Sequence, residues 1–358
     1  LYKYLEKNKK ILSEKNNCTP NVLYVSAKNK KRKRSFKIPK KKWLNNYLDS
    51  TKKNDIDLVI ELIGGSEGPA KKLVFNALKN RKHVVTANKA LIAKYGDQLA
   101  EIAEKNRVNL EFEASVCGGV PIIRSIKEGL IANRIQKIYG IFNGTSNYIL
   151  SSMDKDNKNF LDVLYKAKTL GYAETNPASD LNGDDVAAKL KILSSLCFNS
   201  YLNNNIHVEG IKNIDKEDID NANKLGYKIK LLGYSELINN NIFQRVHPTL
   251  IKTSSYVAGI DGVLNAVIID GSPVGQSIIQ GEGAGPTATT SALVSDISSI
   301  LRGNIKFPFS ISNKKRKKLQ FKNISGRFFS AYLRFEVADK SGVLSNITNI
   351  FSKSKVSI

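Results

Sequence analysis

The chain has 358 residues, and its 56 Lys and Arg outnumber its 32 Asp and Glu, which leaves a net charge of +24 at pH 7. At roughly 100–200 residues per domain, this length predicts two or three domains with well-developed cores. Hydrophobic residues at 41% and charged residues at 25% exclude a wholly disordered or fibrous protein, and no apolar run reaches the ~18–20 residues that cross a bilayer.

Cysteine and histidine are too scarce for several kinds of site. Cys18, Cys117 and Cys197 lie far apart without a CxxC pattern, so we expect neither a disulfide framework nor a zinc site, and we expect a reducing, cytoplasmic location. We expect Cys117 to be a small buried residue rather than a nucleophile. Three histidines are too few for a His-rich metal site or a conventional nucleophile–His triad, so any chemistry uses other groups.

The excess of basic residues suggests one alternative function. Lysines that neutralise phosphates release counterions, so a strongly basic chain invites a nucleic-acid-binding hypothesis. The densest basic run spans residues 28–42, but the other lysines are scattered along the whole chain, and no RRM, KH or zinc-finger pattern accompanies the run. We therefore interpret the excess as a solvated basic surface, with nucleic-acid binding as the alternative.

The N-terminal residues predict a helix followed by a strand. Leu1, Leu5 and Leu12 are the apolar positions of a helix that is already under way at residue 1, so we expect the chain to be truncated there. Residues Val22–Ser26 (VLYVS) predict the strand.

From Asp57 onwards, predicted strands alternate with predicted helices. Leu58–Ile63 is a short apolar run that ends at two glycines, as a buried parallel strand should. The alternation continues along the chain with a helix from Pro69, a strand at His83–Thr86, a helix from about Ala90 to Lys105, a strand at Val108–Glu113 and a helix from near Pro121. This order predicts an α/β fold with a doubly wound parallel sheet.

Three loops directly follow these strands, at residues 64–66, 86–89 and 115–119. In a doubly wound sheet, ligands lie across the carboxyl ends of the strands, so these loops are candidates for binding. Each contains Gly or Asn, which any α/β protein also places in turns, so one such loop alone is weak evidence.

The second half of the chain has longer, mixed segments. Ile268–Gly285 is Gly-rich and leads into a helix over Thr287–Leu301, and residues 313–322 predict a basic linker. The tail predicts a strand at 331–339 (AYLRFEVAD) and an amphipathic helix over 343–350. Because a β-α-β beginning cannot close its own core, we expect a second truncation at the C-terminus.

The most informative stretch is Gly171–Lys191, which carries four carboxylates in a loop that runs into a helix. We expect Asp180 or Asn182 to cap that helix. Asp185 and Lys189 are four residues apart and project from one helix face, which is compatible with an ordinary surface salt bridge. Spacing alone favours the salt bridge, and the alternative is a catalytic lysine that protonates a carbonyl oxygen while the aspartate orients the lysine.

Two further segments carry weaker signals. Gly281–Gly285 (GEGAG) precedes a helix, and its backbone N–H groups could approach phosphates or a nicotinamide ring, but a flexible turn explains it about as well. Asn143–Asn147 (NGTSN) is polar between apolar segments, as a ligand loop or an ordinary turn would be.

Taken together and in order, six motifs resemble those of the homoserine dehydrogenase family. They are ELIGG (61–65), VVTANKALIA (84–93), FEASVCGGVPII (112–123), FNGTSNYIL (142–150), GYAETNPASDLNGDDVAAKL (171–190) and GEGAGPTATTSALVSDI (281–297). The tail, RFEVADKSGVLSNITNIF, resembles the opening of an ACT domain, a regulatory module.

The resemblance implies a Rossmann-type doubly wound parallel sheet lacking its first strand, an α+β catalytic and dimerisation domain, and the start of a βαββαβ ACT domain. The implied boundaries are 1–138 for the NAD(P)-binding domain, 139–312 for the catalytic and dimerisation domain, 313–327 for a linker and 328–358 for the partial ACT domain. The first strand and its GxGxxG loop would precede Leu1, and the helix over 287–303 would return to the first domain.

The resemblance also assigns roles to individual residues. Lys189 would be the catalytic acid–base with Asp185 beside it, and Glu174 and Asp180 would bind the substrate. Cofactor contacts would come from Gly64, Gly65, Lys89 and Gly283. In the family a monovalent cation, usually sodium, is held by a carboxylate and backbone carbonyls, and the matching positions are Glu113, Val116, Gly118 and Val120.

The implied activity is NAD(P)H-dependent, reversible reduction of L-aspartate 4-semialdehyde to L-homoserine, on the route to threonine, methionine and isoleucine. After the predicted second strand stand Ser26, Ala27 and Lys28, where a carboxylate would favour NAD, so we expect NADP, with NAD as the alternative. We expect a homodimer or higher homo-oligomer with no nucleic-acid or membrane partner. The alternatives are a different amino-acid dehydrogenase of related build, the dehydrogenase half of a bifunctional aspartokinase–homoserine dehydrogenase, or a basic nucleic-acid-binding protein.

Overall fold

The computed structural model describes residues 1–202, 205–322 and 329–357. The chain divides into two compact units, Leu1–Ile324 and Ser325–Ile358, which are described separately. No helix among these described residues is long and apolar enough to span a membrane. The larger unit contains both sheets and every residue of the candidate site.

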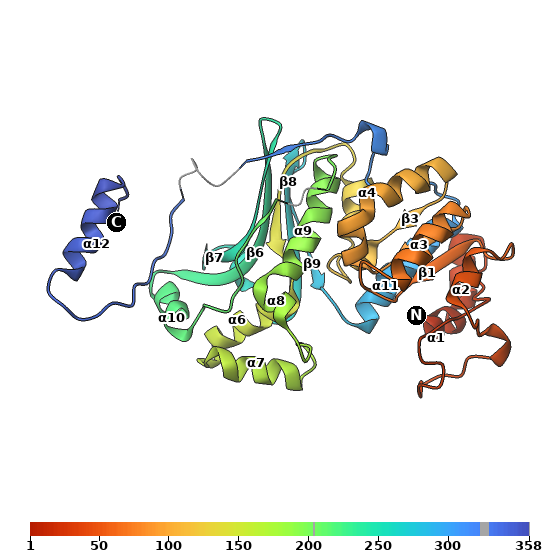
Figure 1. Ribbon diagram of the computed structural model, residues 1–358, viewed down its shortest axis with the longest axis horizontal. Coiled ribbons are helices and arrows are strands. Elements are labelled where there is room, and N and C mark those ends of the chain that lie inside the picture. The colour runs from red at the N-terminus through yellow and green to blue at the C-terminus, as the bar shows by residue number, and fades with distance from the viewer. Residues whose placement is uncertain (203–204, 323–328, 358) are drawn as a thin grey trace. The chain divides into compact units, whose positions relative to one another are not determined.

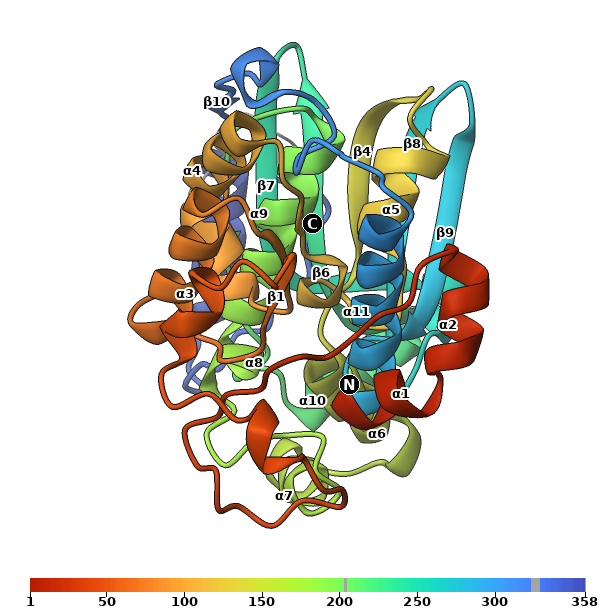
Figure 2. The ribbon, with the colours of Figure 1, turned by 90° about the vertical axis from the view of Figure 1, so that its right-hand side faces the viewer.

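A three-stranded parallel sheet organises the N-terminal part of the larger unit. Its order is β1-β2-β3, formed by β1 (Leu58–Glu61), β2 (His83–Thr86) and β3 (Leu110–Glu111). One face packs against α3 (Pro69–Lys79) and α4 (Lys89–Asn106), and the other against α1 (Tyr2–Lys7), α2 (Lys9–Asn16) and α11 (Pro286–Leu301) (Figure 2). In β2, Val84 packs in the hydrophobic cluster with α3 and α4, and Val85 packs in the cluster with α1, α2 and α11. The sheet is therefore covered on both faces, as predicted.

β2 has the predicted bounds, whereas β1 and β3 are shorter than predicted. β1 ends at Glu61, and the next two residues, which we expected to continue the strand, are 53% and 51% exposed. The cause is local, because the Glu61 carboxylate accepts the N–H of Ile63 at 2.6 Å and turns the chain out of the sheet. The predicted strand Val22–Ser26 is wrong: it makes one isolated bridge, from Val25 to the loop residue Trp43.

A seven-stranded sheet forms the second half of the larger unit, in the order β10-β7-β6-β4-β8-β9 with β5 on β7. Its strands are β4 (Arg134–Ile141), β5 (His207–Val208), β6 (Tyr227–Ile238), β7 (Asn241–Lys252), β8 (Leu264–Ser272), β9 (Gly275–Glu282) and β10 (Gln320–Phe321). The Gly-rich segment of the sequence is thus mostly the antiparallel pair β8–β9, and β9 leads directly toward α11.

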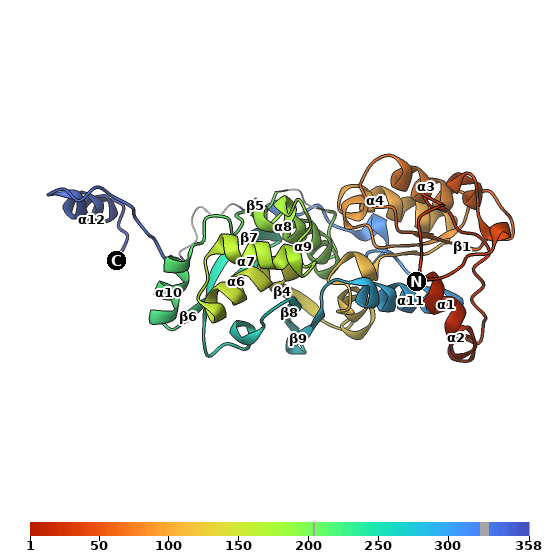
Figure 3. The same ribbon diagram turned by 90° about the horizontal axis from the view of Figure 1, so that it is seen from below.

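α6 (Gly144–Asp156), α9 (Asp184–Cys197) and α10 (Lys216–Lys224) contact strands of this sheet. The same half of the unit also contains α5 (Ile122–Arg124), which continues as one π-turn, α7 (Phe160–Thr169) and α8 (Ala178–Asn182). α9 contacts β4 and β6, and α6 contacts β6 and β8 (Figure 1). Seen from below, α6, α7 and α9 lie on the same side of β4 and β8 (Figure 3).

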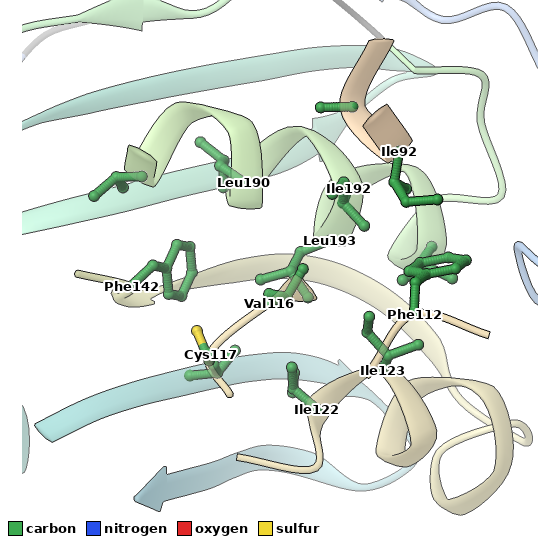
Figure 4. Packing of buried hydrophobic residues seen from close by; sticks show 14 of the residues in the cluster. Ile92, Phe112, Val116, Cys117, Ile122, Ile123, Phe142, Leu190, Ile192 and Leu193 are labelled. Atoms are coloured by element: carbon green, nitrogen blue, oxygen red, sulfur yellow. The ribbon is translucent and has the colours of Figure 1, made fainter. Parts of the chain in front are cut away.

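One continuous core joins the two sheets. Ile92 of α4, Phe112 after β3, Ile123 of α5 and Leu193 of α9 are all buried in it (Figure 4). Burial of apolar surface contributes about 25 cal/mol per Å², so this shared core strongly couples α4 to α9. Because α4 carries the candidate cofactor ligand Lys89 and α9 the candidate catalytic Lys189, this core fixes the position of one relative to the other.

The predicted basic linker is folded against the larger unit. Asn313 and Arg316 are buried, and β10 pairs in parallel with β7. A run of lysines and arginines is typical of a solvated connection, but here Arg316 finds an ion pair with Asp97 and several hydrogen bonds, which compensate its desolvation.

The smaller unit contains α12 (Val343–Lys353), where a helix was predicted. The strand predicted at residues 331–339 is wrong, since no strand forms within 329–357. Backbone groups of a strand need a neighbouring strand, and none is present in that stretch. The apolar side of α12 is uncovered, with Leu344 at 74% and Ile350 at 64% exposure.

Candidate active site

Two of the predicted binding loops, after β1 and β2, are joined by a buried carboxylate. Glu61 is 0% exposed, and its Oε1 accepts the N–H of Ile63 at 2.6 Å and of Gly64 at 2.9 Å. Its Oε2 accepts the hydroxyl of Thr86, at the end of β2, at 2.5 Å. Charge-assisted hydrogen bonds of this kind are the strong ones, so Glu61 determines the shape of both loops.

Asn88 extends this network to the first turn of α4. Its N–H donates to the Thr86 hydroxyl at 3.0 Å, and its amide donates to the carbonyl of Gly65 at 2.8 Å. Its Oδ1 accepts the N–H of Leu91 at 3.0 Å and so caps α4. The next residue, Lys89, therefore begins the helix from a fixed position beside the glycine loop.

Lys89 and Lys189 share one carboxylate. Asp185 Oδ1 lies 2.8 Å from Lys89 Nζ, and Asp185 Oδ2 lies 2.7 Å from Lys189 Nζ. Lys189 also donates to the carbonyl of Phe142 at 2.6 Å. Asp185 and Lys189 are only 5% and 8% exposed, so the predicted i,i+4 pair exists but is buried rather than on the surface.

Asn143 brings the second aspartate into the cluster. Its Oδ1 caps α6 by accepting the N–H of Ser146 at 2.7 Å, which leaves the amide nitrogen to donate to Asp180 at 2.7 Å and to Asp185 at 2.8 Å. Asn143 follows β4 directly, so a strand end positions it. The sequence marked its segment only as a loop or a turn, and its capping position was the signal that could have found it.

Asp180 and Asp185 lie on two consecutive helices, the short α8 and the longer α9, which one glycine separates. The prediction that Asp180 or Asn182 caps α9 is wrong: both belong to α8, and Gly183 with φ +87° is the N-cap of α9. A left-handed glycine lets the chain end one helix and start the next at once. As a result Asp185 lies in the first turn of α9, where the helix dipole favours negative charge.

Charge neutralisation outweighs burial at both members of the pair. Burial by itself would raise the pKa of Asp185, but the ammonium groups of Lys189 and Lys89 and the Asn143 amide hold it well below its usual range. Burial would lower the pKa of Lys189, yet Asp185 outweighs it and the pKa is raised. Burial raises the pKa of Asp180, with Asp185 adding to the effect. Lys189 is therefore an ammonium at neutral pH.

Of the two predicted substrate ligands, Asp180 is hydrogen-bonded into the cluster and Glu174 is not. Glu174 is exposed in the loop between α7 and α8. Among the residues that the structure describes, its carboxylate makes no hydrogen bond or ion pair to the Asp185 cluster. The loop itself is attached to α6, because Thr145 donates its hydroxyl to the carbonyl of Tyr172 at 2.6 Å.

Two glycine loops meet beside the cluster. The N–H of Gly119 donates to the carbonyl of Glu282 at 2.8 Å, and a Cβ added to Gly118 would lie 2.7 Å from the carbonyl oxygen of Gly283. A Cβ on Gly283 would lie 2.1 Å from the side chain of Asn265 on β8. Only glycine allows this approach. Asn265 is fully buried, and nothing in the sequence marked it.

The predicted cation positions form the turn after β3. Both oxygens of Glu113 are occupied, since Oε1 accepts the N–H of Ile123 at 2.8 Å and Oε2 that of Arg124 at 2.7 Å. Burial raises the pKa of Glu113 to about 7, against the opposing effect of these bonds. No group of three His, Cys, Asp or Glu within the described ranges is arranged to bind a metal. The oxygens that a cation could use here are backbone carbonyls and the remaining lone pairs of Glu113.

Comparison with known proteins identifies the family of this chain. The family model described as homoserine dehydrogenase matches residues 121–298, and that of the homoserine dehydrogenase NAD binding domain matches residues 6–113. A homoserine dehydrogenase of Neisseria gonorrhoeae is 42% identical over 318 residues, which are 86% of this chain and 72% of the relative. The chain belongs to the homoserine dehydrogenase family.

Solved structures of the homoserine dehydrogenase family agree with the fold. The crystal structure of a homoserine dehydrogenase from Thiobacillus denitrificans superposes with a TM-score of 0.88 at 36% identity, over 99% of this chain and 83% of that one. A hyperthermophilic archaeal homoserine dehydrogenase mutant in complex with NADPH superposes with a TM-score of 0.62 at 27% identity, over 71% of this chain and 74% of that one.

These matches confirm the predicted family, the α/β fold with a Rossmann-like parallel sheet, and an NAD(P)-dependent oxidoreductase. A nicotinamide cofactor is supported by the NAD-binding domain. The matches favour neither a nucleic-acid-binding protein nor a bifunctional enzyme with an aspartokinase half.

Proposed function

We propose that Lys189 is the proton donor when this chain reduces L-aspartate 4-semialdehyde to L-homoserine, a step toward threonine, methionine and isoleucine. The observation that carries the proposal is the buried ammonium of Lys189, held 2.7 Å from Asp185 and 2.6 Å from the carbonyl of Phe142. A reduced nicotinamide, when bound, supplies the hydride. Lys189 polarises the aldehyde oxygen and transfers its proton to it.

Asp185 keeps this donor charged and in place. Lys89 Nζ lies 2.8 Å from Asp185 Oδ1, and the amide nitrogen of Asn143 donates to Asp185 Oδ2 at 2.8 Å. In the reverse reaction, Lys189 has to accept the hydroxyl proton of homoserine, which requires its neutral form. Because the pKa of Lys189 is raised, oxidation of homoserine is expected to be fastest at alkaline pH.

Asp180 and Glu174 are the proposed ligands of the substrate ammonium. Asp180 uses only its Oδ1 toward Asn143, which leaves the second oxygen as an acceptor. Glu174 carries an exposed carboxylate in the loop that Thr145 attaches to α6. Closure of this loop onto a bound substrate would bring both carboxylates to one ammonium.

The cofactor is proposed to lie over Gly64 and Gly65, beside Lys89 and Gly283. Positive φ values of 86° and 78° at the first two glycines, with no atom within 4 Å of an added Cβ, leave their backbone open to a ligand. NADP is the proposed form, with NAD as the alternative. The exposed Lys28 and the following basic residues would pair with a 2′-phosphate, and the archaeal relative was solved with NADPH.

A sodium ion is proposed at the turn of residues 113–120. Val116, Gly118 and Val120 would supply backbone carbonyl oxygens, which suit a hard monovalent cation. The carboxylate of Glu113 is engaged by the N-terminus of α5, so it would contribute its charge more than a ligand atom. A bound cation would stiffen the turn that touches Gly283.

A homodimer is the proposed assembly, formed through the face of the seven-stranded sheet opposite α6 and α9. Tyr139 and Tyr234 pair on that face at 6.1 Å between ring centres, and Ile278 of β9 is 39% exposed there. Sedimentation of the parent protein and of Ile278→Asp would test this assembly. If both sediment with the mass of a monomer, the proposed homodimer is wrong.

The domain boundaries also remain proposals. The division at residue 138 falls within the shared core of the larger unit, and the ACT assignment for 328–358 is supported by the amphipathic α12. The proposal would give the smaller unit a regulatory role.

Turnover of Lys189→Ala tests the central assignment. The assay is oxidation of NADPH with aspartate semialdehyde as substrate, and the matched control is Lys168→Ala, an exposed lysine on α7. Loss of the proton donor should lower kcat about 10²-fold or more, with KM for NADPH little changed. Turnover of Lys189→Ala close to that of the control would remove Lys189 from this role.

A further inference from the structure

Arg316 lies where the segment of residues 309–317 crosses α4 and α9. Its side chain is 0% exposed, and its guanidinium stacks 4.1 Å from the ring centre of Phe309. Phe309 in turn packs on α4 so closely that a Cβ on Gly96 would lie 2.8 Å from the ring. A buried charge needs partners for all its donors, and those partners identify what Arg316 does.

The first set of partners lies at the C-terminal end of α9. Arg316 Nη2 donates to Ser195 Oγ at 2.7 Å and to the carbonyl of Ser200 at 2.7 Å, and Nε donates to the same carbonyl at 3.0 Å. Ser195 follows Lys189 by six residues on the same helix, so it lies about 9 Å further along the axis. Arg316 thus holds the helix that carries the proposed proton donor.

The second partner lies on α4. Arg316 Nη2 is 2.8 Å from Asp97 Oδ1, and Asp97 follows Lys89 by eight residues, about 12 Å along its helix. Two further bonds attach the same segment to α4, because the N–H of Asn313 donates to the carboxylate of Glu104 at 2.9 and 3.0 Å. The segment therefore contacts α4 at its middle and near its C-terminal end, and α9 at its C-terminal end.

Arginine suits this position because its planar fork serves several acceptors at once. A lysine could satisfy Asp97 or the Ser200 carbonyl but not the whole set in one geometry. Removing the guanidinium would leave Asp97, the Ser200 carbonyl and the Ser195 hydroxyl without a shared donor, and the two helices would lose the link that Arg316 provides between them.

We propose that Arg316 is a positioning residue for the reaction: by linking α4 to α9, it keeps Lys89 in contact with Asp185 and so sets the charge around Lys189. The inference rests on the proposed function of Lys189. Lys89 offsets part of the negative charge of Asp185. When Lys89 moves away, Asp185 acts on Lys189 alone, which raises the pKa of Lys189 further.

A double-mutant cycle between Arg316→Met and Lys89→Met tests the link. We expect Arg316→Met to lower kcat about 10- to 100-fold, as small displacements of catalytic groups do, and to move the acidic limb of the pH profile for homoserine oxidation to higher pH. In the Lys89→Met background, the same change should alter kcat less than about two-fold, because the contact it protects is already gone. Lys315→Met, an exposed neighbour in the same segment, is the matched control.

Every outcome of this double-mutant cycle either supports or overturns the role proposed for Arg316. Equal losses from Arg316→Met in both backgrounds, or an unmoved acidic limb, would show that Arg316 only stabilises the fold and would overturn the proposal. If circular dichroism shows Arg316→Met to be unfolded, Asp97→Ala replaces it, since it removes the carboxylate that Arg316 contacts on α4 and leaves the contacts of Arg316 with Ser195 and Ser200. Asp97→Ala must then shift the limb in the same direction, or the proposal is wrong. Parent-like turnover of Lys189→Ala would instead refute the proposed function itself.

Discussion

Replacing Asp185 with Asn tests two effects of its charge: it stabilises the fold, and it keeps Lys189 protonated. The carboxylate lies 2.7 Å from Lys189 Nζ and 2.8 Å from Lys89 Nζ and is 5% exposed. At an effective dielectric of about 20, each contact is worth roughly 6 kcal/mol of Coulomb energy before desolvation is counted. Removing one partner of a buried ion pair costs about 3–5 kcal/mol, since the remaining charge is left uncompensated. We expect Asp185→Asn to lose stability on that scale at pH 7.

The pH dependence of this loss follows from the directions of the two pKa shifts. The pKa of Asp185 is depressed, so its contribution is present above the ordinary aspartate pKa and disappears as pH falls through the folded value. The pKa of Lys189 is raised, so its contribution is present below the ordinary lysine pKa and is lost as pH rises through the folded value. The stability difference between parent and variant should therefore be largest near neutral pH and shrink in strong acid and strong base.

Urea denaturation at acidic, neutral and alkaline pH measures the stability difference between parent and variant. The pH profile of homoserine oxidation measures the deprotonation of Lys189. Without its counter-charge, Lys189 should deprotonate at lower pH, so the acidic limb of the profile moves down while semialdehyde reduction slows about 10²-fold. Asp184→Asn, the exposed neighbour on α9, is the matched control. The reasoning would be refuted if Asp185→Asn had the same urea midpoint as the control at pH 7 and an unmoved acidic limb in homoserine oxidation.

Three more predictions follow from single contacts. Glu61→Gln should raise KM for the nicotinamide cofactor and destabilise the protein by about 1–3 kcal/mol, because its NH2 group would face the Thr86 hydroxyl, which then loses the acceptor for its proton; titration of the cofactor and thermal melting check this, and unchanged values of both would contradict it. Gly283→Ala should abolish turnover, and Asn265→Ala in the same chain should restore part of it by freeing the space that a Cβ needs, so a double variant as inactive as Gly283→Ala would argue against steric conflict. Burial lowers the pKa of His247 to about 4, so its contribution to stability is present above about pH 6.5 and is lost as pH falls toward 4; His247→Gln should remove about 3 kcal/mol of this acid sensitivity, and an unchanged acid denaturation curve would show that another group causes it.

The elements that the sequence predicted well are those with local causes. The Asp185–Lys189 spacing, the helix from Pro69 and the loops after parallel strands follow from periodicity and from the rule that carboxyl ends of parallel strands meet at one edge. These patterns paired Asp185 with Lys189 and marked the loop of Lys89, and the family resemblance then placed Lys89 and Lys189 in one site.

The parts that the sequence missed depend on contacts between distant segments. Asn143 serves Asp180 and Asp185 from a strand end about forty residues earlier, and Glu61 acts through backbone N–H groups that carry no side-chain signature. Arg316 stands in a run of basic residues that is typical of a solvated linker, and only its tertiary partners distinguish it from its neighbours. Composition describes such residues as surface charge, whereas the fold buries them.

The core shared by α4 and α9 restricts how a ligand can enter. Ile92 and Leu193 belong to one buried cluster, so a hinge motion that separated the two sheets would bring that apolar surface into water. Domain opening of this kind is therefore disfavoured. Access and release must instead depend on the rim, where residues 64–68 and 171–176 are mostly exposed. Substitutions that stiffen these rim loops should slow product departure before they affect the chemical step.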